Sequence, residues 1–129
     1  MKIDHVALYC KDLEATKQFF IDFFEAKPNE LYHNPRTGLK TYILSFPDGD
    51  TRLEIMHRPD VESLIGDEYC HMGYIHLSLS VGSKKQVDFL TLSLKEAGYR
   101  VLSDPRTTGD GYYESCIVGP ERILIEITV

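Results

Sequence analysis

The chain has 129 residues, of which 43% are hydrophobic and 26% charged, as expected for one ordinary globular domain. A formal net charge of −6 argues against nucleic acid or an anionic membrane as the main partner, because both require a basic surface. No apolar run reaches membrane-spanning length, and a strand-like pattern from residue 3 onward leaves no room for a signal peptide. Three widely spaced cysteines indicate free thiols in a reducing cytoplasm: Cys10, Cys70 and Cys116.

The first part of the chain predicts a strand, a helix and then a set of antiparallel strands. Asp12 is a good N-cap for a helix from Leu13 to about Ala26, which carries a broad apolar stripe, and Pro28 is expected to end it. Alternating hydrophobicity and turn residues between the segments predict four strands, at about residues 3–9, 29–33, 40–46 and 51–57.

The last part of the chain predicts the same order of elements. Ser83 and Gln86 have the spacing of a capping box, and the helix that follows is expected to reach Ala97, with Gly98 at its C′ position. Strands are predicted at about residues 74–81, 99–103, 112–118 and 122–128.

These two parts are copies of one module, because the match extends beyond the order of elements. When His76 is aligned with His5, three further segments of the two parts correspond: Asp12 with Ser83, Glu25-Ala26 with Glu96-Ala97, and residues 52–55 with residues 124–127. We therefore expect an α+β fold of two tandem βαβββ modules that form curved sheets around a cavity. The modules are expected at residues 1–57 and 73–129, joined by a linker at 58–72 with a single helical turn near its start.

Strand periodicity places four polar residues on the sheet faces opposite to the helices. Aliphatic rows flank His5, Glu54, His76 and Glu126 on their strands and must face the helices, so these four side chains point the other way. Two imidazoles and two carboxylates form a set that suits a divalent first-row metal such as Zn, Ni, Co, Fe or Mn. The set lacks the thiolates of a structural zinc site and is too rich in nitrogen for Ca or Mg.

A single His or Glu on the outer face of a strand is more often simply solvated, and Arg52 beside Glu54 suggests a plain surface ion pair. The metal hypothesis therefore depends on the pairing. His and Glu are 49 residues apart in the first module (5 to 54) and 50 apart in the second (76 to 126), at corresponding places. His33, His57 and His71 have no such counterpart.

With these features the chain resembles the vicinal oxygen chelate superfamily, which includes glyoxalases, bleomycin resistance proteins and dioxygenases, and within it the glyoxalase I branch. The resemblance implies that His5, Glu54, His76 and Glu126 are the four ligands of one divalent metal ion, most readily Zn or Ni. It also implies a lyase or isomerase that acts through an enediolate on a small carbonyl substrate of the hemithioacetal type. Glu126 would then be the catalytic base and Glu54 its counterpart, and the protein would be a homodimer.

Two features concern the substrate. The segment Thr107–Tyr113 resembles a Gly-rich loop that could close over a ligand with Tyr112 or Tyr113, although a plain inter-strand loop explains it equally well; Arg106 could receive a carboxylate. Two glutathione contacts of the resembled branch are not matched, since Tyr9 stands four residues after His5 and Arg58-Pro59 follow the second ligand strand. The thiol and the substrate are therefore open.

Two other functions are compatible with the same pattern. One is an Fe(II)-dependent dioxygenase, and the other is a binding or resistance protein that holds a small molecule without chemistry. Oxygen consumption would favour the dioxygenase, and the absence of bound metal would favour the binding or resistance protein.

Overall fold

A computed structural model describes residues 3–61, 74–109 and 111–129 of the chain. It divides into two compact units, Met1–Ile65 and Gly66–Val129, and each is described by itself below. Most of the predicted linker, including all of its expected helical turn except Val61, lies outside the described residues.

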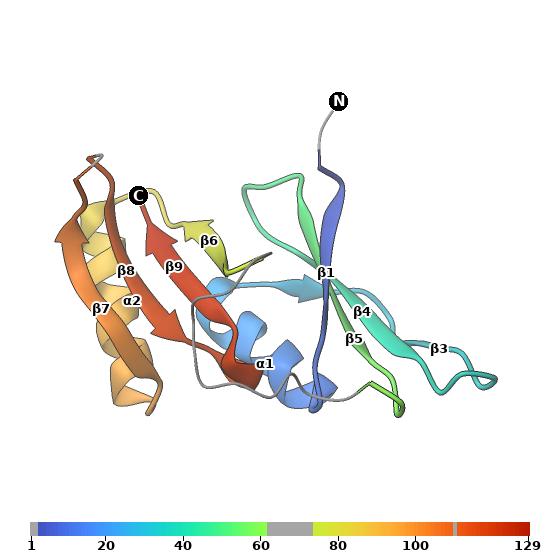
Figure 1. The fold of residues 1–129 in the computed structure, drawn as a ribbon. Coiled ribbons are helices and arrows are strands. Elements are labelled where there is room, and N and C mark those ends of the chain that lie inside the picture. The colour runs from blue at the N-terminus through green and yellow to red at the C-terminus, as the bar shows by residue number, and fades with distance from the viewer. Residues whose placement is uncertain (1–2, 62–73, 110) are drawn as a thin grey trace. The chain divides into compact units, whose positions relative to one another are not determined.

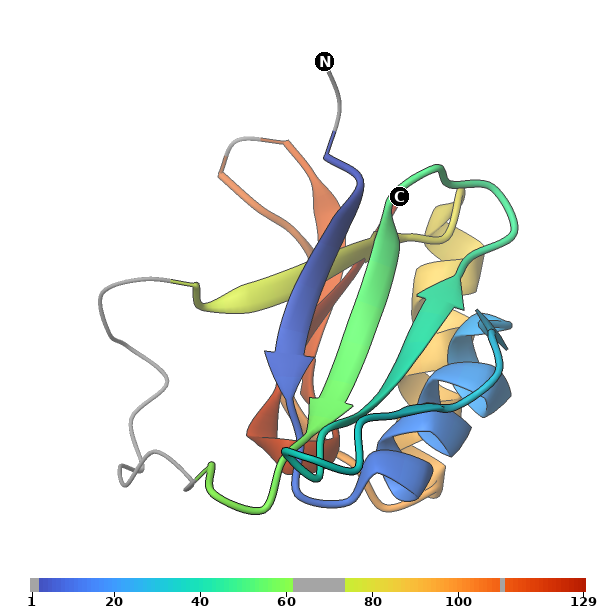
Figure 2. The same cartoon turned by 90° about the vertical axis from the view of Figure 1, so that its right-hand side faces the viewer.

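The first unit is a sheet of five strands with one helix. Strand β1 (His5–Tyr9) pairs in parallel with β5 (Arg52–His57), and β5 pairs with β4 (Lys40–Ser45) in antiparallel fashion, so that the three lie side by side (Figure 2). Two short strands, β2 (Lys27–Pro28) and β3 (Tyr32–His33), both pair with β4. Helix α1 (Leu13–Phe24) packs against β4 and β5.

The second unit repeats this arrangement with four strands. The order in the sheet is β6 (His76–Ser80), β9 (Leu124–Thr128), β8 (Tyr113–Val118) and β7 (Arg100–Thr107), and helix α2 (Lys84–Glu96) lies along one face (Figure 1). The first and last strands again pair in parallel. A 3-10 turn, η1 (Pro120–Arg122), leads into β9.

Both helices begin at the predicted caps. The Asp12 carboxylate accepts a hydrogen bond from the Ala15 amide at 2.9 Å, and the Ser83 hydroxyl accepts one from the Gln86 amide at 3.3 Å. Helix α2 ends before Gly98, whose φ of +93° is the left-handed conformation that glycine adopts without strain at a C′ position.

The predicted end of the first helix is wrong by about two residues. Helix α1 stops at Phe24, where Glu25 takes a left-handed conformation (φ 54°) as C-cap, so Pro28 is not what ends it. Pro28 instead lies in strand β2 at the edge of the sheet, where the missing N–H of proline removes no hydrogen bond between strands. The single strand expected at 29–33 is accordingly two short pieces on either side of residues 29–31.

Strand β7 is longer than predicted, because it continues to Thr107 and pairs with β8 through two irregularities in register. The predicted last strand starts two residues late, because residues 120–122 form the 3-10 turn.

The cores of the two units differ in composition. The first contains an aromatic cluster in which Phe19 and Phe20 of α1 meet edge to face with ring centroids 5.2 Å apart. The second core is aliphatic, and its fully buried side chains are Val87, Leu94, Ile117, Ile125 and Ile127. The predicted α+β class with two βαβββ modules is confirmed, the first module having one additional short strand. Among the described residues, neither helix has the length and apolar character needed to cross a membrane.

Candidate metal site

In each unit, one His and one Glu lie together on the sheet face that the helix does not cover. Leu53 and Ile55 of β5 are buried on the side of α1, so Glu54 between them faces the other way, next to His5 of β1. Ile125 and Ile127 of β9 are buried in the same manner and flank Glu126.

The backbone register gives the two pairs the same geometry. His5 is paired across the sheet with Arg52 and His76 with Leu124, and in each case the Glu is two residues further along the partner strand. The His5 Nε2 atom lies 3.8 Å from the Glu54 carboxylate, and the His76 Nε2 atom lies 3.2 Å from the Glu126 carboxylate.

The distance between nitrogen and oxygen in each pair is compatible, or nearly so, with both atoms binding one divalent cation. Nitrogen and oxygen donors at about 2.1 Å from one metal ion lie about 3.0 to 3.4 Å from each other, depending on the coordination angle. The separation in the second pair falls in that range, and the first requires a shift of a few tenths of an ångström. Within residues 3–61, 74–109 and 111–129, no three His, Cys, Asp or Glu side chains gather as a metal-binding group. Each unit therefore offers two donors and leaves the remaining positions to other ligands.

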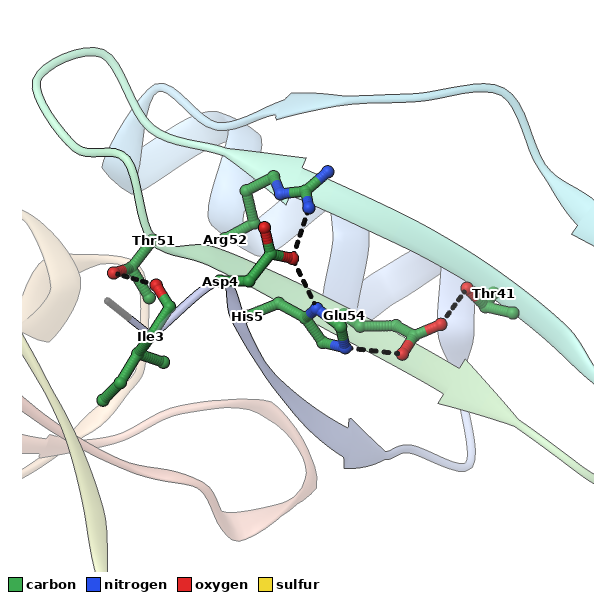
Figure 3. Close-up of polar contacts among 7 residues, drawn as sticks. All are labelled: Ile3, Asp4, His5, Thr41, Thr51, Arg52 and Glu54. Carbon is green, nitrogen blue, oxygen red and sulfur yellow. Dashed lines mark hydrogen bonds and ion pairs between the residues drawn. The ribbon is translucent and has the colours of Figure 1, made fainter. Parts of the chain in front are cut away.

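In the first unit, two residues that the sequence reasoning did not assign to the site, Asp4 and Thr41, contact the pair, and Arg52 contacts Asp4 (Figure 3). The His5 Nδ1 atom lies 2.8 Å from the Asp4 carboxylate, and the guanidinium of Arg52 pairs with the same oxygen of Asp4. The Thr41 hydroxyl donates to Oε1 of Glu54 at 2.9 Å. The hydrogen bond with His5 and then that with Arg52 lower the pKa of the Asp4 carboxyl.

Sequence reasoning missed these contacts for identifiable reasons. Arg52 was interpreted as a surface partner of Glu54, whereas it pairs with Asp4. Asp4 directly precedes the strand residue His5, and Thr41 lies on β4 two positions before Ile43, the residue opposite Glu54. The alignment of β4 with β5 is the signal that would have identified Thr41.

The surroundings of the second pair are different. The positions that correspond to Asp4 and Arg52 are occupied by Ile75 and Leu124, neither of which can hydrogen-bond through its side chain. Across the sheet from Glu126 stands Cys116, a free thiol. Burial raises the pKa of Cys116, and the negative charges of Glu126 and Glu114 contribute in the same direction.

The three residues expected to bind substrate do not share one face. Arg106 is opposite Glu114, and its Nε donates to the Ser103 hydroxyl at 3.0 Å. Tyr113 is held on the side of α2, where its hydroxyl donates to Asp88 at 2.6 Å. The hydrogen bond to Asp88 raises the pKa of Tyr113. The structure therefore does not bring Tyr113 to the face of Glu126.

The loop before β8 is closed by hydrogen bonds. The Thr108 amide donates to the Tyr112 carbonyl at 2.8 Å, and the Thr108 hydroxyl accepts from the Tyr112 amide at 3.0 Å. Tyr112 itself is 60% exposed, so its ring is available to a ligand. Asp110, which the Gly-rich segment includes, lies outside the described residues.

The first unit also has an open cleft of about 520 Å³ at the N-terminal end of α1. Lys11, Glu14, Lys40 and His57 are among its lining residues, and charges of both signs are mixed in it. Neither His5 nor Glu54 lines it, so the cleft is distinct from the His–Glu pair.

Comparison with known proteins places the chain in a family. The family model described as "Glyoxalase/Bleomycin resistance protein/Dioxygenase superfamily" matches residues 2–127. The chain is 33% identical over 128 residues to the uncharacterized protein YqjT of Bacillus subtilis, covering 95% of this chain and 94% of that protein.

Solved structures agree on the fold. A glyoxylase/bleomycin resistance protein/dioxygenase domain from Frankia sp. EAN1pec superposes with a TM-score of 0.83 at 19% identity, over 100% of this chain and 97% of that chain. Glyoxalase I from Zea mays gives a TM-score of 0.79 at 18% identity and covers 98% of this chain but 44% of the maize chain. With its duplicated βαβββ modules and a family match over nearly its whole length, the chain belongs to the glyoxalase, bleomycin resistance protein and dioxygenase superfamily.

Proposed function

We propose that this protein is a metal-dependent lyase or isomerase of the glyoxalase I type, which acts through an enediolate on a small carbonyl substrate of the hemithioacetal class. The observation that carries the proposal is the recurrence of one His–Glu pair, in the same register and on the same sheet face, in both modules. A solvated surface has no requirement for such a recurrence, whereas a mixed nitrogen and oxygen ligand set does.

The proposed site holds one divalent ion through His5, Glu54, His76 and Glu126, with Zn or Ni as the first candidates and Fe, Co or Mn as others. Because each module supplies two donors, the complete set requires both modules, from one chain or from two chains of a homodimer. The free thiol of Cys116 is consistent with our proposal of a cytoplasmic location.

In the proposed reaction, the cation, when bound, would stabilise negative charge that develops on the substrate oxygens. Glu126 would remove the proton from the carbon next to the carbonyl, and the half-buried position of its carboxylate (21% exposed) limits competition from water. Glu54, whose carboxylate is bonded by Thr41, would remain a ligand. Arg106 and Tyr112 would contact the substrate from β7 and from the loop before β8, and Tyr113 would support that loop from the side of α2.

Two relatives bear on the proposal without deciding it. The fold of this chain is that of maize glyoxalase I, a protein whose identity with it is only 18%. The more similar relative, YqjT, is uncharacterized.

The decisive experiment starts with metal analysis of protein purified without chelator. We expect close to one Ni or Zn ion per complete site, and we expect Glu54→Gln to lose it. The metal-loaded protein is then assayed with methylglyoxal and a panel of thiols, since the thiol is not fixed by Tyr9 and Arg58. Metal uptake by Glu54→Gln equal to that of the wild type would contradict the ligand assignment.

The alternatives give different results in the same experiment. An Fe(II)-dependent dioxygenase would consume oxygen and lose activity without iron. A binding or resistance protein would contain no metal under any loading condition.

A further inference from the structure

We propose that Asp4 and Thr41 are positioning residues, which fix the orientation of the His5 ring and of the Glu54 carboxylate so that one donor atom of each faces the other. This inference rests on the proposed function for its purpose, but its geometry is independent of any metal. The contacts that support it are those drawn in Figure 3.

The first step concerns the His5 ring. The oxygen of Asp4 that faces Nδ1 of His5 at 2.8 Å also pairs with the guanidinium of Arg52. A carboxylate in an ion pair with arginine accepts hydrogen bonds and cannot donate one, so Nδ1 of His5 must carry the proton. In the neutral ring this leaves the lone pair on Nε2, the nitrogen that faces Glu54 at 3.8 Å.

The second step concerns the Glu54 carboxylate. The hydroxyl of Thr41, which is buried, donates to Oε1 at 2.9 Å. The other oxygen, Oε2, is the one closest to His5. One oxygen is thus held by Thr41, while the second remains available on the side of the imidazole.

The third step is the comparison within the chain. Ile75 and Leu124 stand at the positions of Asp4 and Arg52, and Glu114 stands at the position of Thr41. The second pair therefore lacks this set of supports. Removal of a residue that hydrogen-bonds a metal ligand and orients it commonly lowers the metal affinity by about 10- to 100-fold. Because only the first pair has the contacts from Asp4 and Thr41, we infer that Glu54, and not Glu126, is the carboxylate that keeps its position.

The first test uses the metal-free protein. Long-range ¹H–¹⁵N NMR spectra of the His5 ring should show a single tautomer with the proton on Nδ1. In Asp4→Ala the ring should exchange between its tautomers, so that the two nitrogen shifts move toward each other. The matched control is Asp60→Ala, which removes an aspartate that pairs with Arg58 instead; it should leave the His5 shifts unchanged. An unaltered His5 spectrum in Asp4→Ala would overturn the role of Asp4.

The second test measures Zn²⁺ affinity by competition with a chromogenic chelator. Asp4→Ala and the isosteric Thr41→Val should each weaken binding by about 10- to 100-fold, whereas Thr41→Ser, which retains the hydroxyl, should restore nearly all of it. Wild-type affinity in Thr41→Val would overturn the role of Thr41. A wild-type protein that binds neither Zn²⁺ nor any of the other candidate ions would refute the proposed function, while the tautomer measurement would still decide the role of Asp4.

Discussion

The two modules share their backbone plan but treat their polar pairs differently. In the first, His5 contacts the Asp4 carboxylate and Glu54 accepts a hydrogen bond from Thr41. In the second, His76 and Glu126 lie closer together, at 3.2 Å, and Ile75, Leu124 and Glu114 stand at the positions of Asp4, Arg52 and Thr41. Duplication thus preserved the donor atoms and changed their surroundings, which permits two carboxylates of the same type to take different roles.

The largest effects are expected when the carboxylate of each pair is replaced by an amide, which tests whether Glu54 and Glu126 have different roles. Under the proposed function, Glu54→Gln should sharply weaken metal uptake, because the carboxylate that Thr41 holds in place is lost. Glu126→Gln should weaken metal uptake less, because its carboxylate has no such hydrogen bond from the residue at the position of Thr41, and it should lose about 10²- to 10⁴-fold in kcat as a missing general base does. Metal content per chain and kcat, measured on both variants, check this. Indistinguishable behaviour of the two variants would show that the modules do not differ in role.

The cores can be compared at equivalent positions. Ile55 and Ile127 are both fully buried and each follows the Glu of its pair, one in the unit with an aromatic cluster and the other in the unit with an aliphatic core. Truncation to Ala should reduce the free energy of unfolding by about 2 to 5 kcal/mol in each case, because a buried aliphatic group is lost and a cavity remains. Urea unfolding of the two variants measures the effect. A loss below about 1 kcal/mol at either position would mean that its module is loosely packed.

A third comparison predicts a gain in stability. Thr16 of α1 is fully buried, and its hydroxyl has no hydrogen-bond partner among the described residues, whereas the corresponding residue of α2 is Val87, also fully buried. A buried hydroxyl without a partner costs about 1 to 3 kcal/mol. Thr16→Val, which has nearly the same shape, should therefore raise the free energy of unfolding by about 1 kcal/mol. The reverse change, Val87→Thr, should lower it, and a stabilising effect there would contradict the explanation.

The smallest effect is expected at the surface of α1. Hydrogen bonds from Lys17 and then from Tyr42 lower the pKa of the Glu14 carboxyl, so the folded state favours the charged form. The stabilisation is therefore present above the ordinary pKa of about 4.5 and is lost as pH falls through the lower pKa of the folded state. Because Glu14 is largely exposed, Glu14→Gln should cost at most about 1 kcal/mol at pH 7 and less near pH 3.

Unfolding at both pH values provides the measurement for Glu14→Gln. Glu96→Gln, in the exposed last turn of α2, is the matched control. A cost for Glu14→Gln that persists unchanged at low pH would exclude the ionic explanation.

Much of the fold could be predicted because the repeat supplied every element twice. The strand of His76 supported the strand of His5, and the Ser83 and Asp12 caps supported each other. The errors fell where the copies diverge. Pro28 was expected to stop a helix, but the left-handed Glu25 does so first, and no sequence rule reliably marks a non-glycine residue for that conformation. Strand β7 exceeded its predicted length because pairing with β8 extends it.

The candidate site was predictable to the level of the two pairs. Strand alternation fixed which side of the sheet His5, Glu54, His76 and Glu126 occupy, and the structure brings each His next to its Glu. Alternation carries no information on neighbours in adjacent strands. For that reason strand alternation alone did not identify the Thr41 contact, the actual partner of Arg52 or the attachment of Tyr113 to the side of α2. The joint use of all four ligands stays a prediction.

Parallel pairing of the first strand with the last gives each module a definite order of assembly during synthesis. His5 leaves the ribosome long before Glu54, and β1 has no partner until β5 has been made. Contacts of such large sequence separation form slowly, because closing the intervening chain costs entropy before the pairing repays it. A nascent chain can therefore bring His5 and Glu54 together only once that module is complete, so the pair does not exist in the unfinished protein.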